Sequence, residues 1–116
     1  MPATTASSTS LVVTDVFKEL PIAKEATTSR VLVNNDVLRH VTFSMDAGQV
    51  LTEHASARAV IVNILRGKMR FVVAGQTYEV SDGDVIYLAP GERHAVEAIE
   101  PTYMSLTLVV VDQNGN

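Results

Sequence analysis

Cysteine is absent from the 116 residues of this chain. That absence excludes disulfide bonds, thiolate nucleophiles, iron–sulfur clusters and zinc sites built on cysteine. Basic residues are also few, since nine lysines and arginines stand against thirteen acidic residues and give a formal net charge of −4. The basic residues lie singly along the chain and form no patch for a phosphate backbone, so we expect no nucleic-acid partner.

Long hydrophobic runs are missing as well, although hydrophobic residues make up 47% of the chain. The uninterrupted apolar stretches, such as residues 108–111, are only a few residues long, too short to span a bilayer. The apolar content nevertheless exceeds that of a disordered chain and is enough for one domain with a hydrophobic core. The first residues have neither the basic start nor the apolar core of a secretory signal, so we expect a cytoplasmic protein without a membrane partner.

The main pattern of the chain is a series of short β-branched and aromatic segments separated by turn-forming residues. Glycine, asparagine and aspartate cluster between these segments at intervals of roughly eight to twelve residues, which is typical of a β-sandwich or β-barrel. We therefore predict an all-β fold. Its strands are expected over residues 30–33, 37–45, 59–65, 69–73, 77–80, 85–88, 94–99 and 103–111.

The predicted domain covers residues 11–111. Residues 1–10, rich in threonine, serine and alanine, are predicted to be a disordered lead-in. The polar residues 112–116 are predicted to be a flexible tail.

A short helical turn is predicted ahead of the first strand, over residues 15–20. Asp15 is a residue type that commonly caps the N-terminus of a helix. Val16, Phe17 and Leu20 would pack inward from this turn, so the segment that leads into the first strand is expected to be helical or irregular.

Three histidines, His40, His54 and His94, are the only side chains that titrate near neutral pH. His54 and His94 each follow a glycine-containing turn that delivers them to the start of a new strand. Two strand-borne histidines that meet inside a barrel can share a metal ion or a polar ligand. His40 shares a strand face with Leu38 and Thr42, from which it could point inward as a third ligand.

Two segments around these histidines, residues 48–67 and 83–98, resemble the two sequence motifs of the cupin family. A short segment separates them, as in small bacterial cupins. The residues that match fixed motif positions are Gly48, His54, Gly67, Gly83, Gly91 and His94. The resemblance implies a double-stranded β-helix, or jelly-roll barrel, over most of the chain.

Three positions depart from the cupin motifs. Ser56 stands where the family has a second histidine, Val60 where it has a glutamate, and Ala98 where it has an asparagine. In metal-binding cupins three histidines and the glutamate hold iron, manganese, nickel or zinc, so the resemblance leaves only His54 and His94 of that set. A divalent metal would need His40 or water to complete its coordination.

Strand alternation, combined with the motif positions, predicts the lining of an internal pocket. Valine and alanine at the substituted motif positions make the interior drier, which favours an apolar or weakly polar ligand. The predicted lining residues are Phe43, Met45, Ser56, Val60, Val62, Phe71, Tyr87, Val96, Ala98 and Met104.

These features lead to two functional hypotheses. In the first, the chain binds a small molecule, with or without a divalent metal, around His54 and His94, which are then its candidate catalytic residues for a weak or specialised activity. In the second, the barrel is a non-catalytic ligand sensor or dimer scaffold without metal. The sequence leaves open whether the chain is an enzyme. Apolar residues on both faces of the strands at 59–65 and 106–111 favour a homodimer, in which a partner subunit covers the outer faces.

Overall fold

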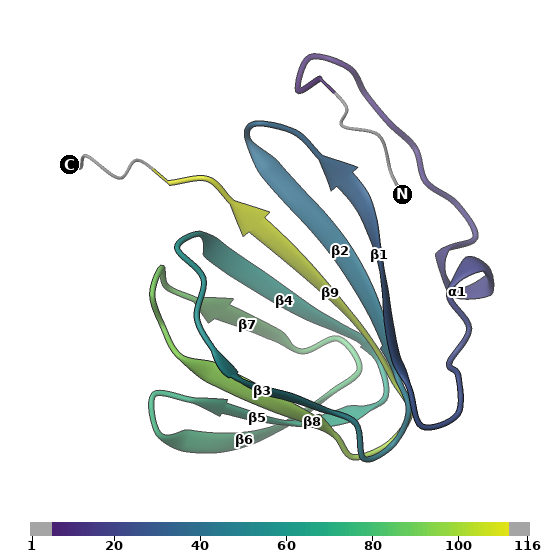
Figure 1. Cartoon of the computed structure of the whole chain (residues 1–116), viewed down its shortest axis with the longest axis vertical. Helices are drawn as coiled ribbons and strands as arrows, with labels where there is room; N and C mark the ends of the chain where they lie inside the picture. Colours follow the sequence, from purple (N-terminus) through teal and green to yellow (C-terminus); the bar gives the residue numbers. More distant parts are fainter. Residues whose placement is uncertain (1–5, 112–116) are drawn as a thin grey trace.

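The computed structural model describes residues 6–111, which form two antiparallel β-sheets that face each other (Figure 1). Sheet A has five strands in the order β1-β2-β9-β4-β7, and sheet B has four in the order β3-β8-β5-β6. The bounds are Thr27–Asn34 (β1), Leu38–Met45 (β2), Val50–His54 (β3), Ala59–Arg66 (β4), Lys68–Val73 (β5), Gln76–Ser81 (β6), Val85–Leu88 (β7), His94–Ala98 (β8) and Thr102–Val109 (β9). The predicted all-β fold is confirmed. The predicted tail, and the first five residues of the predicted lead-in, lie outside the described residues.

All eight predicted strands are present, and their ends differ from the prediction by at most three residues. The sequence predicted no strand over residues 50–54, where the remaining strand, β3, lies. It is an edge strand paired with β8, most of its residues are exposed, and its register is irregular between Leu51 and His54. A strand with so little burial has no alternating hydrophobic pattern by which the sequence could reveal it.

The predicted helical turn is present as α1, Val16–Glu19. The prediction that Asp15 caps it is wrong, because Asp15 has a left-handed backbone (φ 58°) and its side chain makes no capping hydrogen bond. Aromatic packing holds the turn instead: the ring centroids of Phe17 and Tyr103 are 4.2 Å apart, and the guanidinium of Arg66 lies 4.3 Å from the Phe17 centroid. Within residues 6–111, no helix has the length and apolar character needed to cross a membrane.

The hydrophobic core fills the space between the two sheets, because alternate residues of each strand point inward. Phe43 is half-buried and packs against this core. The other residues of the predicted lining that are buried in it are Met45, Val60, Val62, Phe71, Val96, Ala98 and Met104. These side chains face the interior and occupy it.

Tyr87, another residue of the predicted lining, does not face the interior. Its partner across the ladder between β4 and β7 is Ile61, and both side chains are exposed, Tyr87 with 62% of its surface. The neighbours of Tyr87 in β7, Ile86 and Leu88, belong to the inner face, so strand alternation turns Tyr87 outward. Tyr87 therefore lies on the outer face, although it also lines, together with Phe71, a cavity of about 310 Å³ between β5, β6 and β7.

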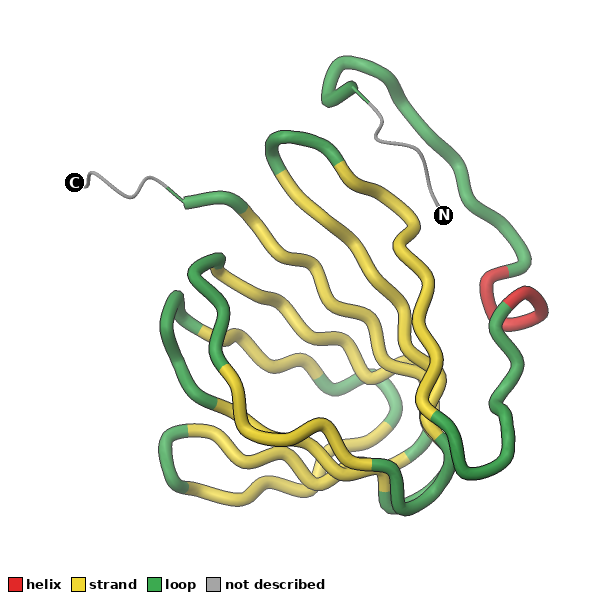
Figure 2. Tube along the Cα trace, viewed as in Figure 1, coloured by secondary structure: helices red, strands yellow, loops and turns green. Residues whose placement is uncertain are grey.

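Ahead of β1 the chain runs beside that strand (Figure 2), and its residues line a cavity together with outer-face residues of sheet A such as His40 and Thr42. We call residues 11–26 the N-terminal strap. The Ser44 hydroxyl donates a hydrogen bond to the carbonyl of Pro21 in the strap (3.4 Å), and the Tyr103 hydroxyl donates one to the carbonyl of Phe17 (3.3 Å). Ser44 and Tyr103 are buried although they lie on the outer face, so the strap covers the part of sheet A that β2 and β9 form.

Candidate functional site

His54 and His94 meet at one end of sheet B. His94 begins β8 as predicted, but His54 is the last residue of β3, so the prediction that it starts a strand is wrong. The two residues are direct partners in the ladder between these strands. Their ring centroids are 4.2 Å apart, and the ring planes form an angle of 61°. The prediction that these two histidines come together is confirmed.

Both imidazole rings are held by the backbone in the same way. Nδ1 of His54 lies 2.7 Å from the carbonyl oxygen of Thr52, and Nδ1 of His94 lies 3.1 Å from that of Glu92. A carbonyl oxygen can only accept a hydrogen bond, so each Nδ1 carries the proton and donates it. In the neutral rings each Nε2 therefore has a free lone pair, and neither Nε2 has a hydrogen-bond partner within residues 6–111.

The two histidines differ in exposure. His94 is buried, with 7% of its surface exposed, whereas His54 is exposed to solvent. Burial lowers the pKa of His94 below the usual 6.5; the Glu92 carbonyl opposes this shift, and the charge of His54 adds to it. His94 is therefore neutral near pH 7 and offers its Nε2 as a hydrogen-bond acceptor.

Apolar side chains close the space behind the histidine pair. The Phe71 ring stacks against that of His94, with 6.1 Å between the centroids. The remaining wall residues are Leu51, Val96, Met104 and Leu106. The enclosed space has a volume of only about 20 Å³, which is room for about one water molecule. The space directly behind the pair is thus nearly filled, and a ligand would reach the pair from the exposed side of His54. The separate cavity of about 310 Å³ between β5, β6 and β7 is lined in part by the inner-face residues Phe71, Val80 and Ile86.

Ser56 occupies the position of the second histidine in the first motif. It lies in the loop between β3 and β4, where its hydroxyl accepts a hydrogen bond from the backbone N–H of Arg58 (3.1 Å). Its carbonyl accepts another from the backbone N–H of Gly91 (2.7 Å). Ser56 therefore ties this loop to the turn before β8 and is not part of the wall behind the histidine pair.

The side chains around the pair do not fit the metal centre that the cupin motifs imply. Of the four usual ligand positions, one holds Ser56, which is engaged in its own loop, and one holds Val60, a hydrocarbon side chain in the core. In the described part of the chain, no three histidine, aspartate or glutamate side chains lie close enough together to hold a metal ion. Two neutral imidazoles fall short of the three protein ligands of a typical mononuclear site.

His40, which the sequence offered as an alternative to water for completing a metal site, lies on the outer face of sheet A, away from the histidine pair. Its ladder partner in β9 is Thr107, and its Nδ1 atom lies 2.8 Å from the Thr107 hydroxyl. The inner face of β2 is formed by Val41, Phe43 and Met45, so alternation turns His40 toward the strap. The interpretation of His40 as an inward-facing ligand is wrong.

Sequence reasoning missed the backbone groups that orient the pair, the carbonyls of Thr52 and Glu92. A carbonyl has no side-chain signature, so these contacts become visible only when the end of β3 and the start of β8 are placed. The exposed ion pair of Glu53 with Arg93 (3.2 Å) was also missed, and it joins the same two strand ends.

Two facing antiparallel sheets of this topology, with paired histidines at one end, define a small jelly-roll barrel protein. The family model for the cupin domain (Cupin_2) matches residues 41–111, and the chain belongs to the cupin family. The chain is similar to a conserved protein of unknown function from Streptococcus pyogenes, with 32% identity, a TM-score of 0.79, and coverage of 90% of this chain and 91% of the other. No functionally curated protein matches the chain.

Two further solved structures show the same fold. A Cupin 2 conserved barrel domain protein from Leptotrichia buccalis is 26% identical, with a TM-score of 0.76 over 80% of this chain and 45% of that one. A cupin superfamily protein from Desulfitobacterium hafniense is 17% identical, with a TM-score of 0.77 over 81% of this chain and 86% of that one. The predicted family and jelly-roll fold are confirmed, while the function has to be argued from the site.

Proposed function

We propose that the chain binds a small ligand at the His54–His94 pair without a metal ion. The observation that carries the proposal is the shared orientation of the two rings, in which both Nδ1 atoms donate to carbonyls and both Nε2 atoms are free. Two adjacent acceptors match a ligand that carries O–H or N–H donors. The ligand binds on the exposed side of His54, at the end of sheet B, because the space behind the pair is filled.

Binding is a better match to this site than acid–base catalysis. The two rings are held by neutral carbonyls of Thr52 and Glu92 rather than by carboxylates, which would raise their basicity. Burial also lowers the pKa of His94, so this ring is a weak base near neutral pH. These two features support a role as hydrogen-bond acceptors.

We propose further that two copies of the chain pair through the outer faces of β4 and β7. This surface carries the exposed apolar side chains of Ile61, Val85 and Tyr87, which have 41%, 59% and 62% of their surface exposed. The strap covers β2 and β9 instead. A sheet that is apolar on both faces is stabilised when a partner covers the outer one.

The ligand proposal is tested with three variants, His54→Phe, His94→Phe and His40→Phe. Each keeps an aromatic ring and removes both ring nitrogens, and His40→Phe is the matched control because His40 lies on the other side of sheet A. Ligand-observed NMR with small amides on chelator-treated protein is expected to detect binding to the wild type and the control. Loss of binding is expected in His54→Phe and His94→Phe. Equal binding by all four proteins would contradict the proposal.

The metal alternative is tested by elemental mass spectrometry after reconstitution with iron, manganese, nickel or zinc. We expect no stoichiometric metal, because the pair lacks a third protein ligand. A near-stoichiometric metal that is retained by His40→Phe and lost from both His54→Phe and His94→Phe would overturn the metal-free proposal.

A further inference from the structure

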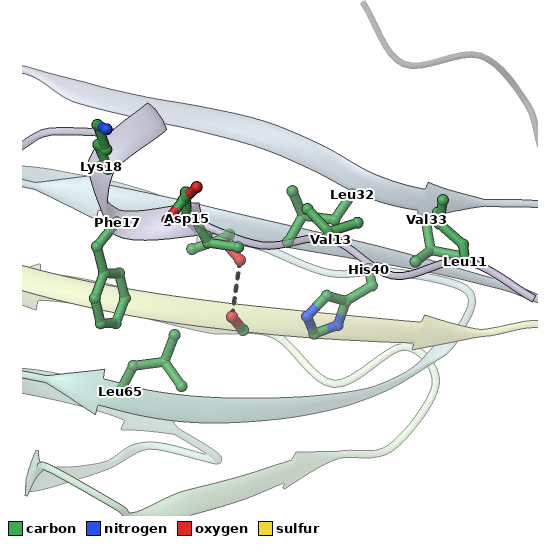
Figure 3. A pocket seen from close by; sticks show the side chains of 12 residues that line it. Leu11, Val13, Asp15, Phe17, Lys18, Leu32, Val33, His40 and Leu65 are labelled. Atoms are coloured by element: carbon green, nitrogen blue, oxygen red, sulfur yellow. Dashed lines mark hydrogen bonds between the residues drawn. The ribbon is translucent and has the colours of Figure 1, made fainter.

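A cavity outside the two-sheet core lies between the N-terminal strap and the outer face of sheet A. Its volume is about 710 Å³, which is within the range of small-molecule sites. Figure 3 shows Leu11 and Val13 of the strap beside Val33 and Leu32 of β1, with His40 on the neighbouring strand. The cavity is thus walled by apolar side chains from two segments that are far from the His54–His94 pair.

The strap is fixed to the sheet from its middle onward and loosely packed at its start. It is fixed at Phe17, which packs on Tyr103 and accepts the hydrogen bond of the Tyr103 hydroxyl at its carbonyl. Toward its start the strap contacts the sheet less closely, since Leu11 is 48% exposed although it lines the cavity. A molecule that enters between strap and sheet can therefore bury the apolar side chains there without breaking the anchor at Phe17.

Most polar groups on the cavity floor already have partners. The hydroxyls of Thr42 and Ser105 lie 2.9 Å apart and are buried together. Nδ1 of His40 pairs with the Thr107 hydroxyl at 2.8 Å. The Nε2 atom of His40 has no hydrogen-bond partner in the chain between residues 6 and 111, so it is the polar group left to a ligand.

The charge of the lining favours an uncharged ligand. Burial lowers the pKa of His40, so its ring is neutral near pH 7. The two charged side chains of the lining, Asp15 and Lys18, have opposite signs and favour neither an anion nor a cation. Thr107 can donate to or accept from the His40 ring, so Nε2 is an acceptor in one tautomer and a donor in the other. A hydroxyl group, which both donates and accepts, pairs with either form.

We propose that this strap cavity is a second ligand site, which takes an uncharged apolar molecule with one hydroxyl group, such as an aliphatic alcohol. The apolar chain packs between the strap and β1, and the hydroxyl bonds to Nε2 of His40. The site is separate from the His54–His94 pair, because it lies on the opposite side of sheet A.

The test is a titration of the ¹⁵N-labelled full chain with 1-octanol, followed by amide NMR. We expect saturable shifts at Leu32, Val33, Thr42 and Ser105, and binding of octanoate that is at least about tenfold weaker because a carboxylate loses its hydration in this cavity. His40→Phe is expected to weaken octanol binding about fivefold, as for the loss of one neutral hydrogen bond. Absence of saturable shifts, or equal binding of octanoate, would overturn the proposal.

A matched pair of strap variants locates the site. Val13→Trp fills the cavity and is expected to abolish octanol binding, whereas Val12→Trp is expected to leave it unchanged, because Val12 is 85% exposed and does not line the cavity. If Val13→Trp does not fold, Leu11→Trp serves the same purpose. Octanol binding that survives every folded cavity-filling variant would refute the site.

Two measurements separate this site from the other proposals. His54→Phe and His94→Phe are expected to leave octanol binding unchanged, and its loss in those variants would place the alcohol at the histidine pair instead. Light scattering combined with intermolecular NMR contacts would show whether the strap of a second copy fills the cavity. A dimer of that kind that excludes octanol would overturn the proposal.

Discussion

His54 and His94, partners across the β3–β8 ladder, make the same local contact. Each donates its Nδ1–H to the carbonyl two residues earlier in the chain, at Thr52 (2.7 Å) and at Glu92 (3.1 Å). The two rings are therefore oriented by the backbone before any ligand arrives. Preorganised side chains reduce the ordering cost of binding, so even a ligand at an exposed rim can bind through two weak hydrogen bonds.

The lowered pKa values of His40 and His94 make the stability of the fold depend on pH. Burial lowers both pKa values below 6.5, the value in the unfolded chain. As the pH falls below 6.5, the unfolded chain therefore binds more protons than the folded one. This contribution to stability is fully present above pH 6.5 and is lost as the pH falls through the lowered pKa values of the folded chain. We expect urea unfolding to give a smaller free energy at about pH 5.5 than at about pH 7.5.

The control for this prediction is the double variant His40→Phe/His94→Phe. Removing both titrating rings is expected to reduce the difference in unfolding free energy between the two pH values. A difference as large as that of the wild type would show that other groups, such as the carboxylates, cause the pH dependence.

Gly67 is expected to be the motif glycine least tolerant of substitution. It has a φ of 109°, and a Cβ atom at this position would lie 2.5 Å from the Pro101 carbonyl and close to Thr102. Gly67→Ala therefore combines backbone strain with a collision and should lower the free energy of unfolding by about 3 kcal/mol. Gly75→Ala is the matched control, since Gly75 has a φ of 78° with open space around it. It should cost about 1 kcal/mol, and equal costs in urea melts would contradict the collision.

The meeting of His54 and His94 could be predicted from the sequence because both stand at fixed positions of the two cupin motifs, although His54 ends its strand and does not begin one. Strand alternation also placed Val60 and Val62 of β4 correctly in the interior, since their position was set by the motif. Position and face are thus predictable where a motif fixes the register.

In β2 and β7 the side-chain types alone do not distinguish the inner face from the outer face. In β2, Thr42 and Ser44 are buried on the outer face beneath the strap, so polarity does not distinguish the two faces. In β7 every residue is apolar, which left the direction of Tyr87 open. The volume left between the sheets also depends on how closely large side chains such as Phe71 approach the histidines, and no sequence pattern reports that distance.

The buried hydroxyl pair of Thr42 and Ser105 is expected to show strong energetic coupling. Thr42→Val removes one hydroxyl and leaves the other without its 2.9 Å partner beneath the strap, which should lower the free energy of unfolding by about 2 kcal/mol. Ser105→Ala should have a similar cost. The double variant should cost less than the sum, because neither unpaired hydroxyl remains. Additive costs in a double-mutant cycle would show that each hydroxyl finds another partner, such as water.

The proposed homodimer makes a prediction about one exposed face. Ile61→Lys and Tyr87→Glu place charges on the outer faces of β4 and β7, where burial in an interface would leave them without partners. Each is expected to shift the chain toward the monomer in size-exclusion chromatography with light scattering. Val50→Glu is the matched control, because Val50 is 52% exposed but belongs to β3, at the edge of the other sheet. It should leave the mass unchanged. A monomeric wild type would refute the dimer. A dimer that only Val50→Glu disrupts would move its interface to the edge of sheet B, where β3 has no neighbour on one side.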